Sequence, residues 1–373
     1  MTGSTRDAPW FGERVLVTGG AGFIANGLIP ELIRAGRMVT VFDNLSTAEP
    51  DWREALESSI GPSPSGSLKV VIGDIRARDE IEAACAGHDA VVHLASSTDI
   101  PGGARDPRLD FESCVLGTSN VLQAMHRHGI RRLVHASSGV VYGSAVARPS
   151  KEDAGPLLPE SHYAAAKLAT EALISGYAHL GDWLAVILRF GNTIGPRTNH
   201  GAVHDFVVKL LRDPGRLEIL GDGRQTKPFI AVPDLVSGIG AASAAAVDVP
   251  VVTYNVATRH ALPLTDVART VADALGLDSD SIALETTAER RGWPGDTTQV
   301  DLDSGALRNL GWTPELDGRS AVRWAAAGIA SRYRSSGAAL LTGLERRRSV
   351  GAVAARDDRE AMSAGVGDRL RAG

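Results

Sequence analysis

The chain has little cysteine, no excess of basic charge and no long hydrophobic run. Cys85 and Cys114 are its only cysteines, too few for a disulfide framework or a cysteine-rich metal site, which fits a reducing cytoplasm. A net charge of −5 argues against a nucleic-acid partner, which would need a basic face. No stretch approaches the roughly 20 apolar residues of a membrane span, and residues 1–14 lack the apolar core of a signal peptide. We therefore expect a cytoplasmic protein with no membrane, nucleic-acid or metal partner.

What is present is the composition of an ordinary globular protein, with 43% hydrophobic and 22% charged residues among 373. Short β-branched apolar runs alternate with longer segments of helical periodicity, such as 107–128 and 162–179. Such runs are typical of strands buried on both faces, which form right-handed βαβ units and a parallel sheet. The six runs up to Phe190 are RVLVTGG, MVTVFD, LKVVIGD, DAVVHLAS, RRLVHASS and LAVILRF.

These patterns predict three parts of the chain. Residues 12–190 are expected to form an α/β domain, a Rossmann-type doubly wound parallel sheet. Beyond it, the short runs LEIL, PFIAV and VTYNVA lie among helical segments. Residues 191–335 are therefore expected to form mainly a smaller α/β lobe, with some segments returning to the core. Residues 345–373 are rich in Ala, Gly and Arg with weak apolar periodicity, which predicts a disordered tail.

The stretch VLVTGGAGFIANG, residues 15–27, places glycines between a strand and a helical segment. A helix N-terminus attracts anions, and glycine allows the tight turn that brings a pyrophosphate close to the backbone. The spacing Gly19-x-x-Gly22-x-x-Ala25, followed by Asp43 at the end of the second strand, is typical of a dinucleotide site. The Asp43 carboxylate would bind the adenosine ribose and repel a 2′-phosphate, which favours NAD over NADP. Asp43 could instead be a solvated loop residue or a helix cap.

The segment SHYAAAKLATEAL places Tyr163 and Lys167 four residues apart, on one face of a helix. An ammonium beside a phenol lowers the phenol's pKa and would make a general base for an alcohol proton. Ser138 ends the fifth strand run, at the sheet edge where open α/β sheets bind ligands. The alternatives are an exposed helix pair and a serine that caps a turn.

Taken together, the chain resembles the extended short-chain dehydrogenases/reductases of the NAD-dependent epimerase/dehydratase family, and among them nucleotide-sugar 4-epimerases such as UDP-glucose 4-epimerase. The resemblance covers about residues 12–335. It rests on VLVTGGAGFI, VFDNLS, GDIRARDEI, DAVVHLAS, LGTSNVLQA, HASSGVVYG, YAAAK, RFGNTIGPR, LEILGDGRQTKPFIAVPDL and RGWPGDTTQVDLD.

The resemblance implies a role for each matching residue. Ser138, Tyr163 and Lys167 match the catalytic trio. The cofactor NAD would contact the trio's Tyr163 and Lys167 and the residues Gly19, Gly22, Phe23, Ile24, Asp43, Asn44, Asp74, Ile75, Leu94, Ala95 and Ser97. The nucleotide diphosphate would lie in the smaller, substrate-binding lobe, held by Asn192, Lys227, Arg291 and Asp296, with Ser138 at the sugar. The alternatives are turn residues at Asn192 and Asp296 and a surface charge at Arg291.

Four positions depart from the family's pattern, and one of them, Pro228, gives up a backbone N–H donor. Cys114 stands where an asparagine usually supports the active-site helix, and cysteine is a poor hydrogen-bonding group. Ala25 replaces the third glycine of the turn, and its methyl is expected to cost about 1 kcal/mol. Lys227 replaces an arginine and loses its two-pronged donor geometry. These departures leave the site residues in place but could weaken the activity.

The expected activity is NAD-dependent epimerisation of a nucleotide-diphosphate sugar at C4, through a 4-keto intermediate. Gly139 and Val140 follow Ser138, where family dehydratases and decarboxylases carry an acid, so dehydration is disfavoured. The alternatives are a decarboxylase or dehydrogenase of the same family, and a catalytically silent NAD-binding regulatory protein.

The sugar, the base and the assembly stay open at this stage. Arg189 and Arg197 are candidate partners for a glucuronate carboxylate, although Arg189 ends a strand and could pair internally. Val300 is a candidate for setting the size of the sugar. The resemblance also implies a UDP-sugar substrate and a homodimer formed through the helices over 107–128 and 162–179.

Overall fold

Seven parallel strands form one sheet in the computed structural model, which describes residues 12–62, 64–245, 249–287 and 289–335. The strand order is β11-β6-β5-β4-β1-β2-β3, and each neighbouring pair is parallel. The strands are β1 (Arg14–Thr18), β2 (Met38–Asp43), β3 (Ser67–Ile72), β4 (Ala90–His93), β5 (Arg132–Ser138), β6 (Leu184–Phe190) and β11 (Val251–Val256). This order confirms the Rossmann-type doubly wound fold. The tail predicted over 345–373 lies outside the described residues.

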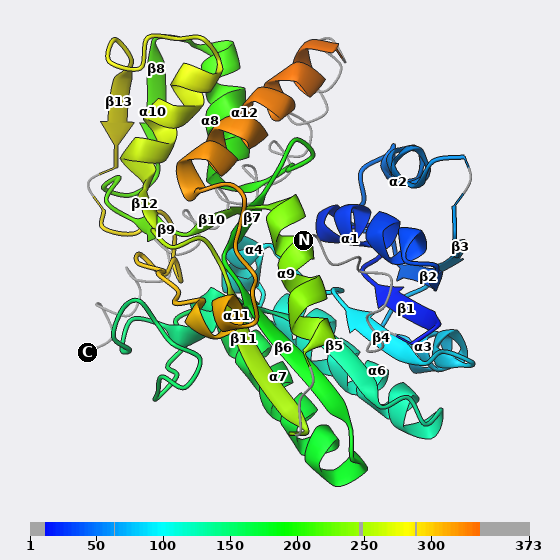
Figure 1. Cartoon of the computed structure of the whole chain (residues 1–373). Helices are drawn as coiled ribbons and strands as arrows, with labels where there is room; N and C mark the ends of the chain where they lie inside the picture. The colour runs from blue at the N-terminus through cyan, green and yellow to red at the C-terminus, as the bar shows by residue number, and fades with distance from the viewer. Residues whose placement is uncertain (1–11, 63, 246–248, 288, 336–373) are drawn as a thin grey trace, which may run out of the picture.

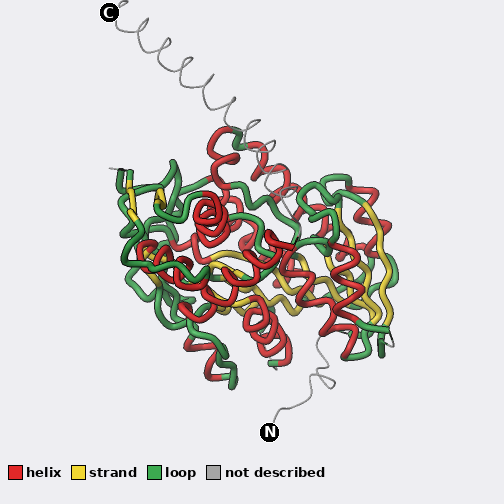
Figure 2. The backbone as a smooth tube through the Cα atoms, turned by 90° about the horizontal axis from the view of Figure 1, so that it is seen from above, coloured by secondary structure: helices red, strands yellow, loops and turns green. Residues whose placement is uncertain are grey.

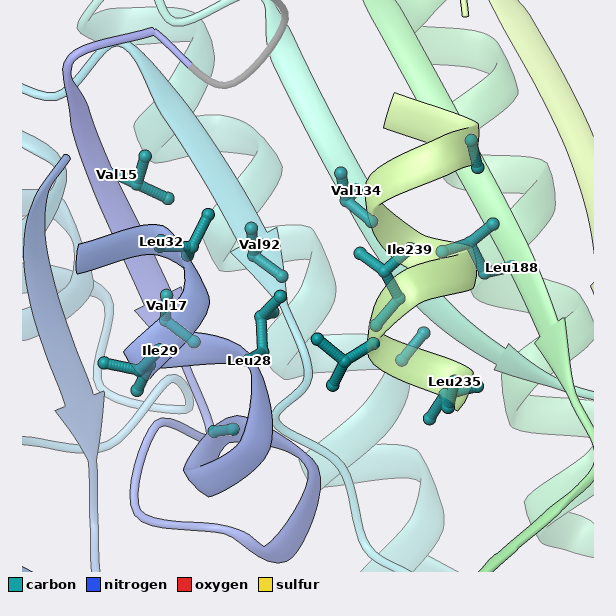
Figure 3. Close-up of a cluster of buried hydrophobic side chains, with 14 of the residues drawn as sticks. Val15, Val17, Leu28, Ile29, Leu32, Val92, Val134, Leu188, Leu235 and Ile239 are labelled. Atoms are coloured by element: carbon teal, nitrogen blue, oxygen red, sulfur yellow. The ribbon is translucent and has the colours of Figure 1, made fainter. Parts of the chain in front are cut away.

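The apolar strand runs reflect burial on both faces of the sheet. In β1, Val15 and Val17 enter one hydrophobic cluster, and Leu16 between them enters another on the opposite face. Figure 3 shows Val15 and Val17 on the side of β1 that carries Leu28, Ile29 and Leu32 of the first helix, all from the first cluster. Because alternate side chains point to opposite faces, a strand covered on both sides has no polar alternation to show.

Helices cover both faces, as the view from above in Figure 2 shows. One face is packed by α1 (Phe23–Arg34), α2 (Trp52–Ile60) and α9 (Val232–Ala244), whose buried side chains share a cluster with Val15 and Val17. The other face is packed by α3 (Arg78–Cys85), α6 (Gly117–Arg127) and α7 (His162–Gly181). Within the described ranges, no helix is both long and apolar enough to cross a bilayer.

A second cluster of elements lies beyond the sheet's carboxyl edge, at the upper left of Figure 1. Helices α8 (Gly201–Arg212), α10 (Leu264–Ala274) and α12 (Gly318–Ser335) share a hydrophobic core there. The strands of this lobe pair in twos: β7 (Asn192–Ile194) with β10 (Phe229–Ala231), β8 (Arg216–Ile219) with β13 (Ala283–Thr286), and β9 (Thr226–Lys227) with β12 (Leu262–Pro263). The run VTYNVA, expected among these short strands, forms β11 and joins the main sheet beside β6.

The remaining helical elements line the carboxyl edge or return to the sheet: α4 (Ile100–Arg105), α5 (Arg108–Asp110), the π-helical η3 (Phe111–Leu116), the short η4 (Gly139–Tyr142) and α11 (Gly305–Asn309). The segment expected as one helix over 107–128 is thus interrupted by a π-helical turn between α5 and α6. Because all seven strands are parallel, the residues that follow β1, β2, β4 and β5 meet at one edge of the sheet.

Candidate active site

The glycine turn between β1 and α1 forms a cradle in which Gly19 and Gly20 have no room for a side chain. Gly19 has φ +68°, and a Cβ there would lie 2.7 Å from the backbone nitrogen of Ala95. Gly22 precedes α1, which begins without a side-chain cap. The free N–H groups of the first turn and the positive end of the helix dipole can therefore take a phosphate. These features fit the pyrophosphate of a dinucleotide.

Asp43 at the end of β2 anchors this turn. Its Oδ2 accepts a hydrogen bond from the Ala21 N–H at 3.0 Å, and its Oδ1 accepts one from the Leu45 N–H at 2.7 Å. Partial burial raises the pKa of Asp43, and the two backbone hydrogen bonds oppose the rise. A carboxylate has about four acceptor sites, so it can also bind a ribose diol. Contact with the ribose stays a prediction.

Two neighbouring loops carry three more of the residues predicted to contact NAD, namely Asn44, Asp74 and Ile75. Asn44 donates to Asp74 at 2.9 Å, and the Arg76 guanidinium bound to Asp74 lowers the pKa of that carboxyl to about 2. The Ile75 side chain, in contrast, is only 7% exposed and packs in the core. Only the backbone of Ile75 is therefore placed to reach a ligand. Arg76 was not singled out from the sequence.

The structure brings the three predicted catalytic residues together where β5 meets α7. Ser138 ends β5, and Tyr163 lies in the first turn of α7, whose N-terminus is capped by Ser161. The Lys167 Nζ lies 5.9 Å from the centre of the Tyr163 ring and donates to the Ala136 carbonyl at 2.7 Å.

The electrostatics of Tyr163 differ from the prediction that Lys167 lowers its pKa. Burial raises the pKa of the phenol, and the hydrogen bond with Ser138 lowers it only in part. Burial also lowers the pKa of Lys167. The protein alone thus favours the neutral phenol, so a phenolate at Tyr163 would need a further positive charge nearby.

Cys114 lies on the π-helical turn η3, next to this centre. Its side chain is buried, and its Sγ is 3.1 Å from the Ser96 Oγ. Ser96 belongs to the loop after β4 that also carries Leu94, Ala95 and Ser97, three of the residues predicted to contact NAD. Cys114 therefore supports this loop, although it is a weak hydrogen-bonding group.

A buried histidine at the end of β4 stabilises the start of the same loop. His93 ends β4 and makes hydrogen bonds with Thr18 at 2.6 Å and Thr118 at 2.9 Å. Burial lowers the pKa of His93 to about 3, so the ring is neutral. The Leu94 N–H in turn donates to the Thr18 carbonyl at 3.1 Å. The sequence showed His93 only as the polar end of an apolar strand.

Two of the four residues predicted to hold the nucleotide diphosphate pair with each other. Lys227 donates to Asp296 at 2.8 Å, and both are buried. Arg291 is exposed and lies 3.4 Å from Glu160. Asn192 is exposed at the start of β7. To bind Lys227 and Arg291, a diphosphate would have to replace their present partners, Asp296 and Glu160.

The remaining candidates from the sequence are engaged elsewhere. Arg189 forms a buried two-pronged ion pair with Glu171, at 3.0 and 2.7 Å, so the internal pairing considered for it is present. Arg197 pairs with Asp51 at 2.6 Å. Val300 is buried in the cluster that contains Leu302.

Comparison with known proteins places this arrangement. The model of the NAD dependent epimerase/dehydratase family matches residues 15–257, more than half of the chain. The chain belongs to this family. The match confirms the resemblance drawn from the sequence.

Individual relatives match most of this chain and nearly all of their own length. The UDP-glucose 4-epimerase of Mycolicibacterium smegmatis is 31% identical over 316 residues, which are 81% of this chain and 94% of the relative. The structure of the Thermus thermophilus UDP-glucose 4-epimerase in complex with NAD is 30% identical, with a TM-score of 0.74, and the match covers 86% of this chain and all of that one. A dTDP-glucose 4,6-dehydratase of an Actinoplanes species is 29% identical over 82% of this chain and 93% of its own length.

Proposed function

We propose that this protein is an NAD-dependent nucleotide-sugar 4-epimerase that acts on a UDP-sugar. The observation that carries the proposal is the placement of Ser138, Tyr163 and Lys167 at the sheet edge that also bears the glycine cradle and Asp43. The relatives named UDP-glucose 4-epimerase support the reaction and the nucleotide.

In the proposed reaction, Tyr163 as phenolate accepts the proton of the sugar's 4-hydroxyl, and the Ser138 hydroxyl relays it. When bound, NAD would accept the C4 hydride, give it back, and add a positive charge near Tyr163. Lys167, fixed on Ala136, keeps a second positive charge beside the phenolate. The nucleotide diphosphate stays held in the smaller lobe by Asn192, by the cations Lys227 and Arg291 at its phosphates, and by Asp296 at its ribose. The 4-keto sugar meanwhile turns over and receives the returning proton from Tyr163. C4 is thereby inverted with no net redox change.

The surroundings of Ser138 favour epimerisation over dehydration. A dehydratase needs an acid near the sugar to expel a hydroxyl. At Gly139 a Cβ would lie 2.7 Å from the Leu302 Cδ1, so this position has no room for an acidic side chain without a shift of Leu302. Val140 carries no exchangeable side-chain proton. The dehydratase relative keeps dehydration as the second candidate.

Glucose and galactose fit this site better than glucuronate. A uronic acid needs a cation at its carboxylate. The two arginines considered for that role are bound to Glu171 and Asp51. A uronate would have to break one of these pairs, and the Arg189 pair is buried.

A homodimer in the cytoplasm completes the proposal. Leu109, Phe111 and Leu116 are 44%, 57% and 40% exposed on the helical segment that packs against α7, which is an apolar surface suited to a second copy. Cys85 and Cys114 are free buried thiols, as expected in a reducing compartment. Light scattering on the wild type and on Phe111→Glu tests the dimer, because a charge at the centre of that surface should give monomers.

The activity is tested by offering purified protein and NAD one UDP-sugar per sample, namely UDP-glucose, UDP-galactose, UDP-glucuronic acid and UDP-N-acetylglucosamine. Proton NMR should show the C4 epimer with UDP-glucose and UDP-galactose, without accumulation of NADH. A 4-keto-6-deoxy product or release of CO2 would instead identify a dehydratase or a decarboxylase. Binding of NAD without turnover of any sugar would favour a regulatory protein.

A further inference from the structure

A polar cluster joins the loop after β2 to the smaller lobe. Arg197 donates to both carboxylate oxygens of Asp51, at 2.6 and 3.0 Å, and Asn199 donates to Glu49 at 2.5 Å. The Arg332 guanidinium lies 3.6 Å from Glu49 and 4.0 Å from Asp51. We call Glu49, Asp51, Arg197, Asn199 and Arg332 the interlobe strap.

The acidic half of the strap belongs to the loop that begins with Asp43 and Asn44. This loop is stiffened by its own hydrogen bonds, from the Leu45 N–H to Asp43, from the Ser46 N–H to Asn44 and from the Trp52 N–H to the Glu49 carbonyl. It ends at α2, which is fixed in the core. A displacement of Asp51 would therefore also displace Asp43 and Asn44, the residues at the start of this loop.

The basic half belongs to elements of the smaller lobe. Arg197 and Asn199 follow β7, the strand that starts at Asn192, and Arg332 is on α12. The Arg197 hydrogen bond lowers the pKa of Asp51, which keeps this carboxylate ionised. The side chains of Arg197 and Arg332 are only 27% and 28% exposed, so salt screens them less than it screens a fully exposed pair.

We propose that the interlobe strap holds the 43–51 loop over the adenosine end of the NAD site and slows release of the cofactor between turnovers. Asp51 and Arg197 are its principal positioning residues, since their two-pronged pair is the most directional contact. This inference rests on the proposed function, in which NAD is regenerated in each cycle and need not leave. It also gives Arg197 a role other than recognition of a sugar carboxylate.

The test measures release of NAD from the purified holoenzyme. Alcohol dehydrogenase with ethanol converts NAD that leaves the protein to NADH, which is followed by absorbance. Arg197→Gln and Asp51→Asn should each release NAD about tenfold faster than the wild type. The exchanged pair Asp51→Arg with Arg197→Asp should return the rate to within about threefold of the wild type.

Arg14→Gln is the matched control, because Arg14 forms an ion pair with Asp89 at 2.8 Å at the opposite end of the sheet. Its release rate should equal that of the wild type. Unchanged release from both single variants, at full NAD occupancy and with wild-type thermal unfolding, would overturn the strap. If NAD release is slow and depends on the strap, but the protein turns over no sugar, the result would support the role of the strap and refute the proposed epimerase activity. A wild-type protein that never holds NAD would refute both.

Discussion

The Lys167 ammonium donates a hydrogen bond to the Ala136 carbonyl at 2.7 Å, which fixes the catalytic helix to strand β5 two residues before Ser138. The strand and the helix are joined by packing as well, because Ile174 of α7 lies in the cluster beneath the sheet. The relative positions of Ser138, Tyr163 and Lys167 are therefore set by the folded chain before a substrate arrives. Such preorganisation is what a proton transfer to a positioned base requires.

Replacing Tyr163 by Phe removes the proposed general base while keeping the ring. Turnover should fall by about 10²- to 10⁴-fold, and the protein should still fold and bind NAD. Tyr177→Phe is a suitable control, because Tyr177 lies further along the same helix and packs against Trp183. Epimerisation at near-normal rate by Tyr163→Phe, measured by NMR, would show that another group takes the proton.

The glycine cradle is tested by Gly19→Ala against Gly36→Ala. Both positions have positive φ, +68° and +81°, so both substitutions carry the backbone strain of a left-handed residue. Only at Gly19 would the new Cβ also meet backbone, 2.7 Å from the Ala95 nitrogen, whereas Gly36 faces open space. Gly36→Ala should cost about 1 kcal/mol of unfolding free energy and retain NAD. Gly19→Ala should cost more and lose the cofactor; equal effects in urea unfolding and NAD titration would contradict the cradle.

The buried pair of Lys227 and Asp296 makes a prediction that separates stability from binding. Asp296→Asn leaves the Lys227 ammonium buried without its carboxylate and should cost about 3–5 kcal/mol. Lys227→Met with Asp296→Leu should recover most of that stability but should not recover UDP binding. The exposed pair of Arg269 and Asp280 serves as control, and Asp280→Asn should change stability by less than about 1 kcal/mol. UDP affinity is measured by calorimetry. Recovery of that affinity in the double variant would show that neither Lys227 nor Asp296 belongs to the substrate site.

The free energy of unfolding should fall as the pH drops below the pKa of histidine in the unfolded chain. Burial lowers the pKa of His93 to about 3 and that of His135 well below its usual range, whereas both rise to about 6.5 on unfolding. The unfolded chain therefore binds more protons below pH 6.5, and each ring should remove up to about 1.4 kcal/mol per pH unit. Urea unfolding between pH 6.5 and 5 checks this above the titration of most carboxylates. A flat profile would contradict it.

The strands of the main sheet were largely predictable because burial on both faces leaves uninterrupted apolar runs. The segment over 251–256 carries the same signal, yet its place was not predicted, since it lies next in sequence to the strands of the smaller lobe. The helix α9 returns the chain across the sheet, so that Val251–Val256 pairs with β6 more than 60 residues earlier. Sequence neighbours gave no sign of that long-range pairing.

The candidate site residues were predicted from motifs, but the motifs did not reveal their partners. Lys227 meets Asp296 and Arg197 meets Asp51 across 69 and 146 residues, respectively. No local pattern marks such contacts, so Lys227, Asp296 and Arg197 were predicted as available groups and Asp51 was not singled out. The raised pKa of Tyr163 was missed for a related reason. It arises from burial by several elements, whereas the i,i+4 spacing shows only Lys167.

The most direct test of the account follows the hydrogen on C4. UDP-galactose carrying deuterium at C4 is converted by the wild-type protein in ordinary water, and the product is analysed by NMR and mass spectrometry. A C4 hydride that leaves and returns within one active site predicts UDP-glucose with deuterium still at C4 and no build-up of NADH. Loss of the deuterium to solvent, or a product changed at another carbon, would contradict transient oxidation at C4.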